Sequence, residues 1–132
     1  MKAAAVKWLK QAKHDLDMAD KNIDIGGYDV ASFLSHQAVE KLLKAIIIYE
    51  GKKSPKSHYL DQIAKTLMLS GDIMDDLNEL SADYMISRYP DVMDSVPFEE
   101  YDRDIALEKV AIARKIFEQL QDRSSFPEVD DE

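Results

Sequence analysis

The amino-acid sequence predicts an all-α fold, an antiparallel up-and-down bundle of four long helices and one short helix. Apolar residues recur every three or four positions in five successive segments, which is the periodicity of amphipathic helices. The chain has only 4 Gly and 4 Pro in 132 residues, too few for the many turns of an all-β fold. Short connections favour antiparallel neighbours. We therefore expect one helical domain over residues 1–122 and an acidic, flexible tail over residues 123–132.

Two glycines separate the first two predicted helices. An apolar stripe from Val6 to Ile23 predicts a helix over about residues 2–25, which Gly26 and Gly27 end. Asp29 is expected to cap the second helix, which extends to about residue 51. The apolar stripe of this second helix is expected to contain Val30, Leu34, Ala38, Leu42, Ala45 and Tyr49.

The second half of the chain contains the short helix and two longer ones. The short helix is expected over about residues 57–70, before Gly71. The next helix begins near Ile73 and must end before Pro90, because a proline disfavours helical geometry in the residue that precedes it. The last helix is expected over about residues 102–122, with Asp102 as its N-cap.

Composition and charge exclude several classes of protein. Cysteine is absent, which excludes disulfide scaffolds and thiolate-bound metals and favours a cytoplasmic location. No apolar run approaches the ~18–20 residues that span a bilayer. The net charge of −9 argues against binding of duplex DNA, although residues 1–66 carry +3 and residues 67–132 carry −12. The sequence also lacks metal-binding and Gly-rich phosphate-binding motifs, so we expect neither a metal nor a cofactor.

The densest polar cluster lies on the second predicted helix. Gln37, Glu40, Lys41 and Lys44 are spaced three and four residues apart, so they share a helix face. The two lysines could hold a phosphate. They could equally extend into solvent, with Glu40 and Lys44 forming a simple pair one helical turn apart. Gln37 could equally cross-link helices through hydrogen bonds.

Two histidines accompany this cluster. His36 adjoins it but faces another direction, so a surface or a dimer interface is as good an interpretation as a ligand site. His58 is expected in the first turn of the short helix, beside a basic segment over residues 52–56. There its imidazole would contact the backbone or a phosphate at the helix N-terminus.

A second group of candidates lies where the fourth predicted helix ends. Arg88 is the strongest of them, because a guanidinium binds phosphate through two parallel hydrogen bonds. Tyr89 could stack on a base or belong to the core, and Asp91 could instead pair with Arg88. The candidate nucleotide- or phosphate-binding residues are therefore Gln37, Glu40, Lys41, Lys44, His58, Arg88, Tyr89 and Asp91.

Two motifs resemble those of a known family. Residues 35–45, SHQAVEKLLKA, and residues 88–91, RYPD, resemble the HEPN family of small prokaryotic helical proteins over roughly residues 5–120. The resemblance implies a four- to five-helix bundle that usually forms homodimers. It also implies an association with a minimal nucleotidyltransferase, frequently as a toxin–antitoxin pair, and binding of nucleotide or RNA. Some members of the family are metal-independent ribonucleases, with an Arg followed after four to six residues by a His.

The sequence departs from this ribonuclease pattern. The positions allowed for the His after Arg88 are occupied by Met93, Asp94 and Ser95. Without a histidine to move a proton, the sequence favours a non-catalytic module that binds a nucleotide or a nucleotidyltransferase partner. A ribonuclease with a substituted site, in which His36 or His58 approaches Arg88, and a purely structural dimer are the alternatives.

Overall fold

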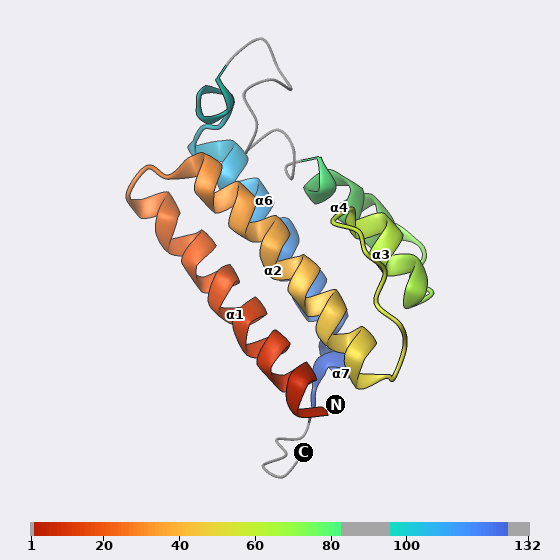
Figure 1. Cartoon of the computed structure of the whole chain (residues 1–132). Coiled ribbons are helices and arrows are strands. Elements are labelled where there is room, and N and C mark those ends of the chain that lie inside the picture. The colour runs from red at the N-terminus through yellow and green to blue at the C-terminus, as the bar shows by residue number, and fades with distance from the viewer. Residues whose placement is uncertain (1, 83–95, 127–132) are drawn as a thin grey trace.

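The structure is a computed structural model, which describes residues 2–82 and 96–126. Those residues contain helices and no β-strand, so the predicted all-α fold is confirmed. The elements are α1 (Lys2–Asp24), α2 (Tyr28–Tyr49), α3 (Leu60–Thr66), α4 (Asp72–Ser81), the 3-10 helix η2 (Pro97–Glu100), α6 (Arg103–Gln119) and α7 (Gln121–Ser124) (Figure 1).

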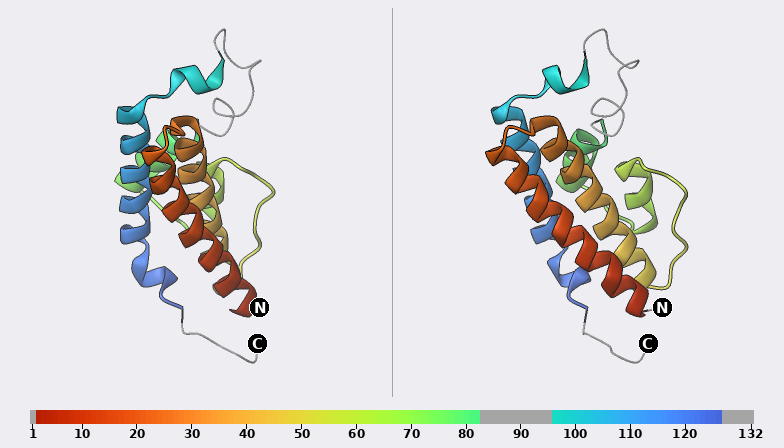
Figure 2. Two further views of the ribbon diagram at one scale, coloured as in Figure 1. Left: turned by 90° about the vertical axis from the view of Figure 1, so that its left-hand side faces the viewer. Right: turned by 60° about the vertical axis from the view of Figure 1, so that its left-hand side comes forward.

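Helix α2 lies at the centre of the bundle. It runs antiparallel to α1, α6 lies behind the pair, and α3 and α4 cover the other side of α2 (Figures 1 and 2). Helices α1, α3, α4, α6, α7 and η2 all contact α2. The predicted bundle is thus present. The part of the fourth predicted helix between Ala82 and Pro90 lies almost entirely outside the described residues.

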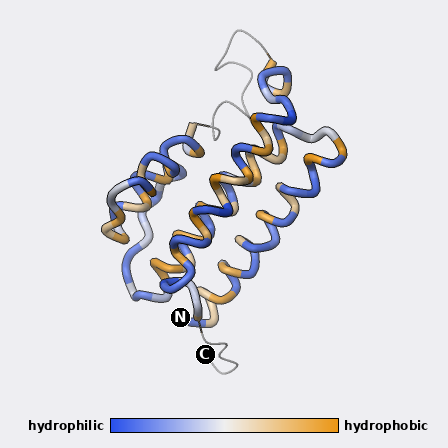
Figure 3. Tube along the Cα trace, turned by 180° about the vertical axis from the view of Figure 1, so that it is seen from behind, coloured by the Kyte–Doolittle hydropathy of each residue, from blue (hydrophilic) through white to orange (hydrophobic). Residues whose placement is uncertain are grey.

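The main hydrophobic core surrounds the C-terminal half of α2. Leu42, Leu43, Ile46 and Ile47 are fully buried there against α1, α3, α4 and α6. Figure 3 shows the matching apolar positions along the helices. Each such side chain stabilises the fold by about 1.5–3 kcal/mol. A smaller cluster at the other end of the bundle contains Ala19, Ile23, Ala31, Ala106 and Val110.

The position of Val30 was wrongly predicted. Its side chain is 41% exposed, whereas the adjacent Ala31 is fully buried. Because α2 is enclosed from several sides, its buried surface is much wider than a single stripe, and at its N-terminus that surface is centred on Ala31 and Ser35.

The helix ends confirm some predicted boundaries and correct others. Gly26 has a φ of 79°, which favours glycine, and it follows the end of α1 as expected. The N-cap of α2 is Gly27, so Asp29 lies within the first turn and is not the cap. Asp102 does cap α6, because its carboxylate accepts a hydrogen bond of 2.8 Å from the backbone N–H of Ile105.

Arg123 and Phe126, near the C-terminus, both contact the body of the bundle. The Arg123 guanidinium donates hydrogen bonds of 2.7 and 2.9 Å to the Glu50 carboxylate and one of 2.9 Å to the Leu67 carbonyl. This guanidinium lowers the pKa of Glu50. Phe126 stacks on Tyr49 with the ring centroids 4.3 Å apart. Residues 123–126 of the predicted tail therefore pack against the bundle, and residues 127–132 lie outside the described part.

Crossing a membrane requires a helix that is both long and apolar. None of the helices within residues 2–82 and 96–126 combines the two properties well enough to do so.

Candidate functional site

The candidate site is centred on a buried carboxylate of α2. Glu40 is only 5% exposed, because α2 is enclosed by its neighbours. Its Oε2 accepts a hydrogen bond of 2.8 Å from Lys44 Nζ and lies 3.1 Å from His58 Nδ1. Its Oε1 lies 3.8 Å from His36 Nδ1. A buried carboxylate is costly unless cations or hydrogen-bond donors surround it, and Lys44 and His58 are the two groups within hydrogen-bond distance of this one.

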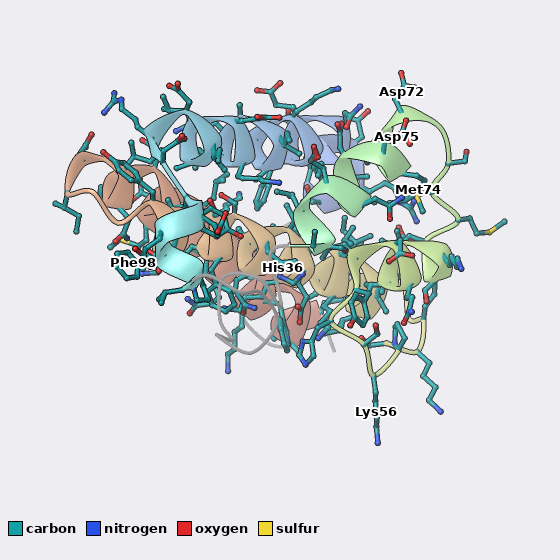
Figure 4. The ribbon with its side chains drawn as sticks, turned by 90° about the horizontal axis from the view of Figure 1, so that it is seen from above. His36, Lys56, Asp72, Met74, Asp75 and Phe98 are labelled. Carbon is teal, nitrogen blue, oxygen red and sulfur yellow. The ribbon has the colours of Figure 1, made fainter. Side chains whose placement is uncertain are left out.

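His36 occupies the interior of the molecule. Its side chain is fully buried, which corrects the expected placement at a surface or a dimer interface (Figure 4). Its Nε2 donates a hydrogen bond of 2.9 Å to the carbonyl oxygen of His58. Burial lowers the pKa of His36, although the negative charge of Glu40 opposes this effect. The imidazole is therefore neutral at pH 7.

His58 lies before α3 and not in its first turn, which is a second correction. The helix begins at Leu60 with Tyr59 as its N-cap, so the predicted start near residue 57 is three residues too early. The His58 ring contacts Glu40 while 54% of its side chain stays exposed. This contact ties the loop between α2 and α3 to the buried carboxylate. Lys56, in the same loop, points away from the body of the molecule (Figure 4).

A second buried carboxylate, Asp15 of α1, neutralises Lys41. Asp15 is 5% exposed and forms an ion pair with the Lys41 ammonium. Its other oxygen accepts a hydrogen bond of 2.9 Å from Gln11 Nε2. Asp15 was not among the predicted site residues. The available signal was its position three residues after Ala12 and four before Ala19, which places a charge within the buried stripe of α1.

The structure therefore divides the polar cluster of α2 between two neighbours. Lys41 turns towards Asp15 on α1, whereas Glu40 and Lys44 meet His58 from the loop before α3. Gln37 is half-buried and makes no hydrogen bond within the described residues. Neither lysine is a free cation, since each forms an ion pair with a buried carboxylate.

The other predicted candidates, Arg88, Tyr89 and Asp91, lie outside the described residues. Their placement beside Lys41 or Lys44 stays a prediction. The chemistry available in the described part is that of a charge-balanced buried network with one half-exposed imidazole at its edge.

Comparisons with known proteins identify the family. The HEPN domain matches residues 5–123. The crystal structure of TT1696 from Thermus thermophilus is 27% identical, with a TM-score of 0.83 over 90% of this chain and 97% of that one. ST0689, described as an archaeal HEPN homologue, is 30% identical, with a TM-score of 0.76 over 91% and 97% of the two chains. None of the curated proteins compared matches the sequence. The domain match covers most of the chain, and the chain therefore belongs to the HEPN family.

Proposed function

We propose that this chain is a non-catalytic binding module, which recognises a nucleotide or a nucleotidyltransferase partner and acts with a minimal nucleotidyltransferase in a toxin–antitoxin-like pair. The observation that carries the proposal is the use of the histidines. The chain has three, and none follows Arg88 at the spacing of the family's ribonucleases. His36 is buried and bonded to the backbone, His58 is held by Glu40, and His14 is exposed on α1.

The pairing of the lysines supports a protein partner over a free phosphate at the face of α2. A phosphate bound by Lys41 or Lys44 would have to compete with Asp15 or Glu40, both of which are buried beside their lysines. A protein surface needs no such exchange, because it can cover the existing ion pairs. Arg88 remains the candidate for a compact phosphate ligand.

Co-expression tests the partner. A minimal nucleotidyltransferase encoded by the adjacent reading frame should co-purify with this chain as a stoichiometric complex. Light scattering of the chain alone should give about twice its 15.1 kDa mass, because a homodimer is the predicted assembly. Failure of a co-expressed nucleotidyltransferase to form a complex would contradict the partner proposal. A monomer at every concentration would contradict the dimer.

Calorimetry with AMP and ATP tests the nucleotide. Replacing Arg88 with Ala should weaken nucleotide binding by about 1.5–3 kcal/mol, if the guanidinium makes a buried charged hydrogen bond. Arg88→Lys should restore part of that loss, since an ammonium lacks the planar fork. The matched control is Arg114→Ala, which removes an exposed arginine paired with Asp20 at 3.2 Å. Equal binding by wild type and Arg88→Ala would remove Arg88 from the site.

A second function is favoured by one observation. A carboxylate that holds an imidazole while the ring stays half-exposed is also the arrangement of a general base, and Glu40 holds His58 in this way. A ribonuclease with a substituted site would therefore use His58. RNA should be cleaved by such an enzyme, and His58→Ala and Arg88→Ala should each abolish the cleavage. We expect no cleavage above a protein-free control.

A further inference from the structure

The outer surface shared by α1 and α2 contains an open groove of about 270 Å³. Lys7, Trp8 and Gln11 of α1 and Lys41 of α2 line it, and the exposed lining is almost entirely carbon. Trp8 is the only tryptophan of the chain and is 37% exposed. Lys44 Nζ lies 5.8 Å from the centroid of its ring. The Trp8 ring therefore lies under the Lys44 ammonium and still leaves part of its surface open to solvent.

The charges around this groove leave one positive charge uncompensated. Lys41 is paired with Asp15, and Lys44 is paired with Glu40. Lys7 is exposed and forms no ion pair within the described residues. The side-chain amide of Gln11 donates a hydrogen bond to Asp15. The groove therefore offers an aromatic surface and one free ammonium, and one N–H of its amide is already hydrogen-bonded to Asp15.

The surrounding part of α1 strengthens the positive field. Its first turn contains no acidic residue, and Asp15 is the first acid of the chain. Four lysines precede Asp15, and the first of them also lies in the first turn of the helix, where the macrodipole is positive. They are Lys2, Lys7, Lys10 and Lys13. An approaching group with negative charge is thus attracted to this end of α1, although the chain as a whole carries −9.

We propose that this groove docks an acidic segment of a protein partner, with an aromatic side chain of the partner lying on Trp8 and an adjacent carboxylate paired with Lys7. Offset stacking on an exposed tryptophan is a frequent centre of protein interfaces. The proposal rests on the partner-binding function proposed above and assigns it a surface. In such a complex, the ion pairs of Lys41 with Asp15 and of Lys44 with Glu40 would lie at the edge of the interface. The partner would cover them without breaking them.

The same observations disfavour a nucleotide in this groove. A volume of about 270 Å³ is slightly below the ~300–1,000 Å³ of ordinary small-molecule sites. One free ammonium does not match the several negative charges of a nucleoside diphosphate or triphosphate.

The single tryptophan makes the test direct, because its fluorescence reports on the groove alone. The probe is a blocked pentapeptide with a central phenylalanine flanked by two acidic residues on each side. We expect a saturable change in Trp8 emission in low salt, which weakens as salt rises. A peptide with alanine in place of phenylalanine, and one with lysines in place of the acids, should each bind at least tenfold more weakly.

Charge reversal on α1 locates the binding. Lys7→Glu should weaken binding of the acidic peptide at least tenfold. Because Lys7 is exposed, the variant should keep its helical content. Lys21→Glu is the control, compared at about 0.1 M salt, because it makes the same change about 21 Å further along the helix, which is roughly two Debye lengths at that salt concentration. No saturable change with the acidic peptide, equal effects of the two variants, or an equal response to AMP would overturn the proposal.

Co-expression separates this proposal from the function on which it rests. If a complex with the nucleotidyltransferase forms and survives Lys7→Glu, the partner-binding function stands and the groove is not the docking surface. If no complex forms with the wild type, the partner-binding function itself fails. If the complex forms and Lys7→Glu weakens it at least tenfold while Lys21→Glu does not, both are supported.

Discussion

Two buried carboxylates, Asp15 and Glu40, hold the candidate site together in different ways. Each is 5% exposed and each neutralises one lysine of α2. Asp15 has a lysine and an amide as partners, so its surroundings carry one fixed positive charge. Glu40 has a lysine and two imidazoles as neighbours, and burial lowers the pKa of one of these imidazoles, His36. The first carboxylate is part of a helix-to-helix ion pair, whereas the second lies beside a buried imidazole.

The difference also concerns what each carboxylate joins. Asp15 connects α1 to α2, two helices that already pack along their whole length. Glu40 connects α2 to the loop before the seven-residue α3, a helix that contacts α2 far less extensively than α1 does. Loss of Glu40 should therefore release more structure than loss of Asp15.

The largest effect is expected from Glu40→Gln. The variant leaves Lys44 without its counterion and replaces the carboxylate that holds His58 with a neutral amide, whose oxygen is a weaker acceptor. Breaking a buried ion pair on one side costs about 3–5 kcal/mol in the free energy of unfolding. Urea denaturation of the wild type and the variant measures this loss. A change below about 1 kcal/mol would show that Glu40 is not the centre of the network.

A smaller loss is expected from Asp15→Asn. Lys41 is 24% exposed, so its ammonium can turn towards water, and the asparagine oxygen can still accept from Gln11. We expect a loss of about 1–3 kcal/mol. The same urea experiment compares it with Glu40→Gln, and a greater loss for Asp15→Asn would reverse the ranking of the two carboxylates. Lys21→Ala is the control, because its exposed pair with Asp17 is worth less than about 1 kcal/mol.

The pH dependence of stability should separate the two regions further. The pKa of His36 is lower in the folded chain than its ordinary value of 6.5. Below pH 6.5 the unfolded chain therefore binds more protons, and the free energy of unfolding falls as the pH falls towards the folded pKa. His36→Gln keeps a donor for the His58 carbonyl and should flatten this dependence between pH 7 and 5. If the free energy of unfolding changes with pH equally steeply in the wild type and the variant, His36 is not the group responsible.

The sequence predicted the helices well and the contacts of the site poorly. Periodicity located the long helices, and the local signal at Asp102 identified a real cap, because both depend on residues close in the chain. The pairing of Asp15 with Lys41 joins residues 26 positions apart and depends on how α1 rotates against α2. The burial of His36 likewise depends on the loop before α3 folding over α2. A helical periodicity gives the face of a residue on its own helix but not the neighbour that covers it.

The measurement that most directly tests the charge balance at α2 is a calorimetric titration with ATP at low salt. It compares the wild type with Lys41→Met and Lys44→Met, after circular dichroism has shown that each variant is folded. Because Asp15 and Glu40 neutralise these lysines, we expect ATP affinity to change less than twofold in either variant, or ATP to bind none of the three proteins. A tenfold or greater loss in either folded variant would contradict this conclusion and restore the face of α2 as a phosphate site.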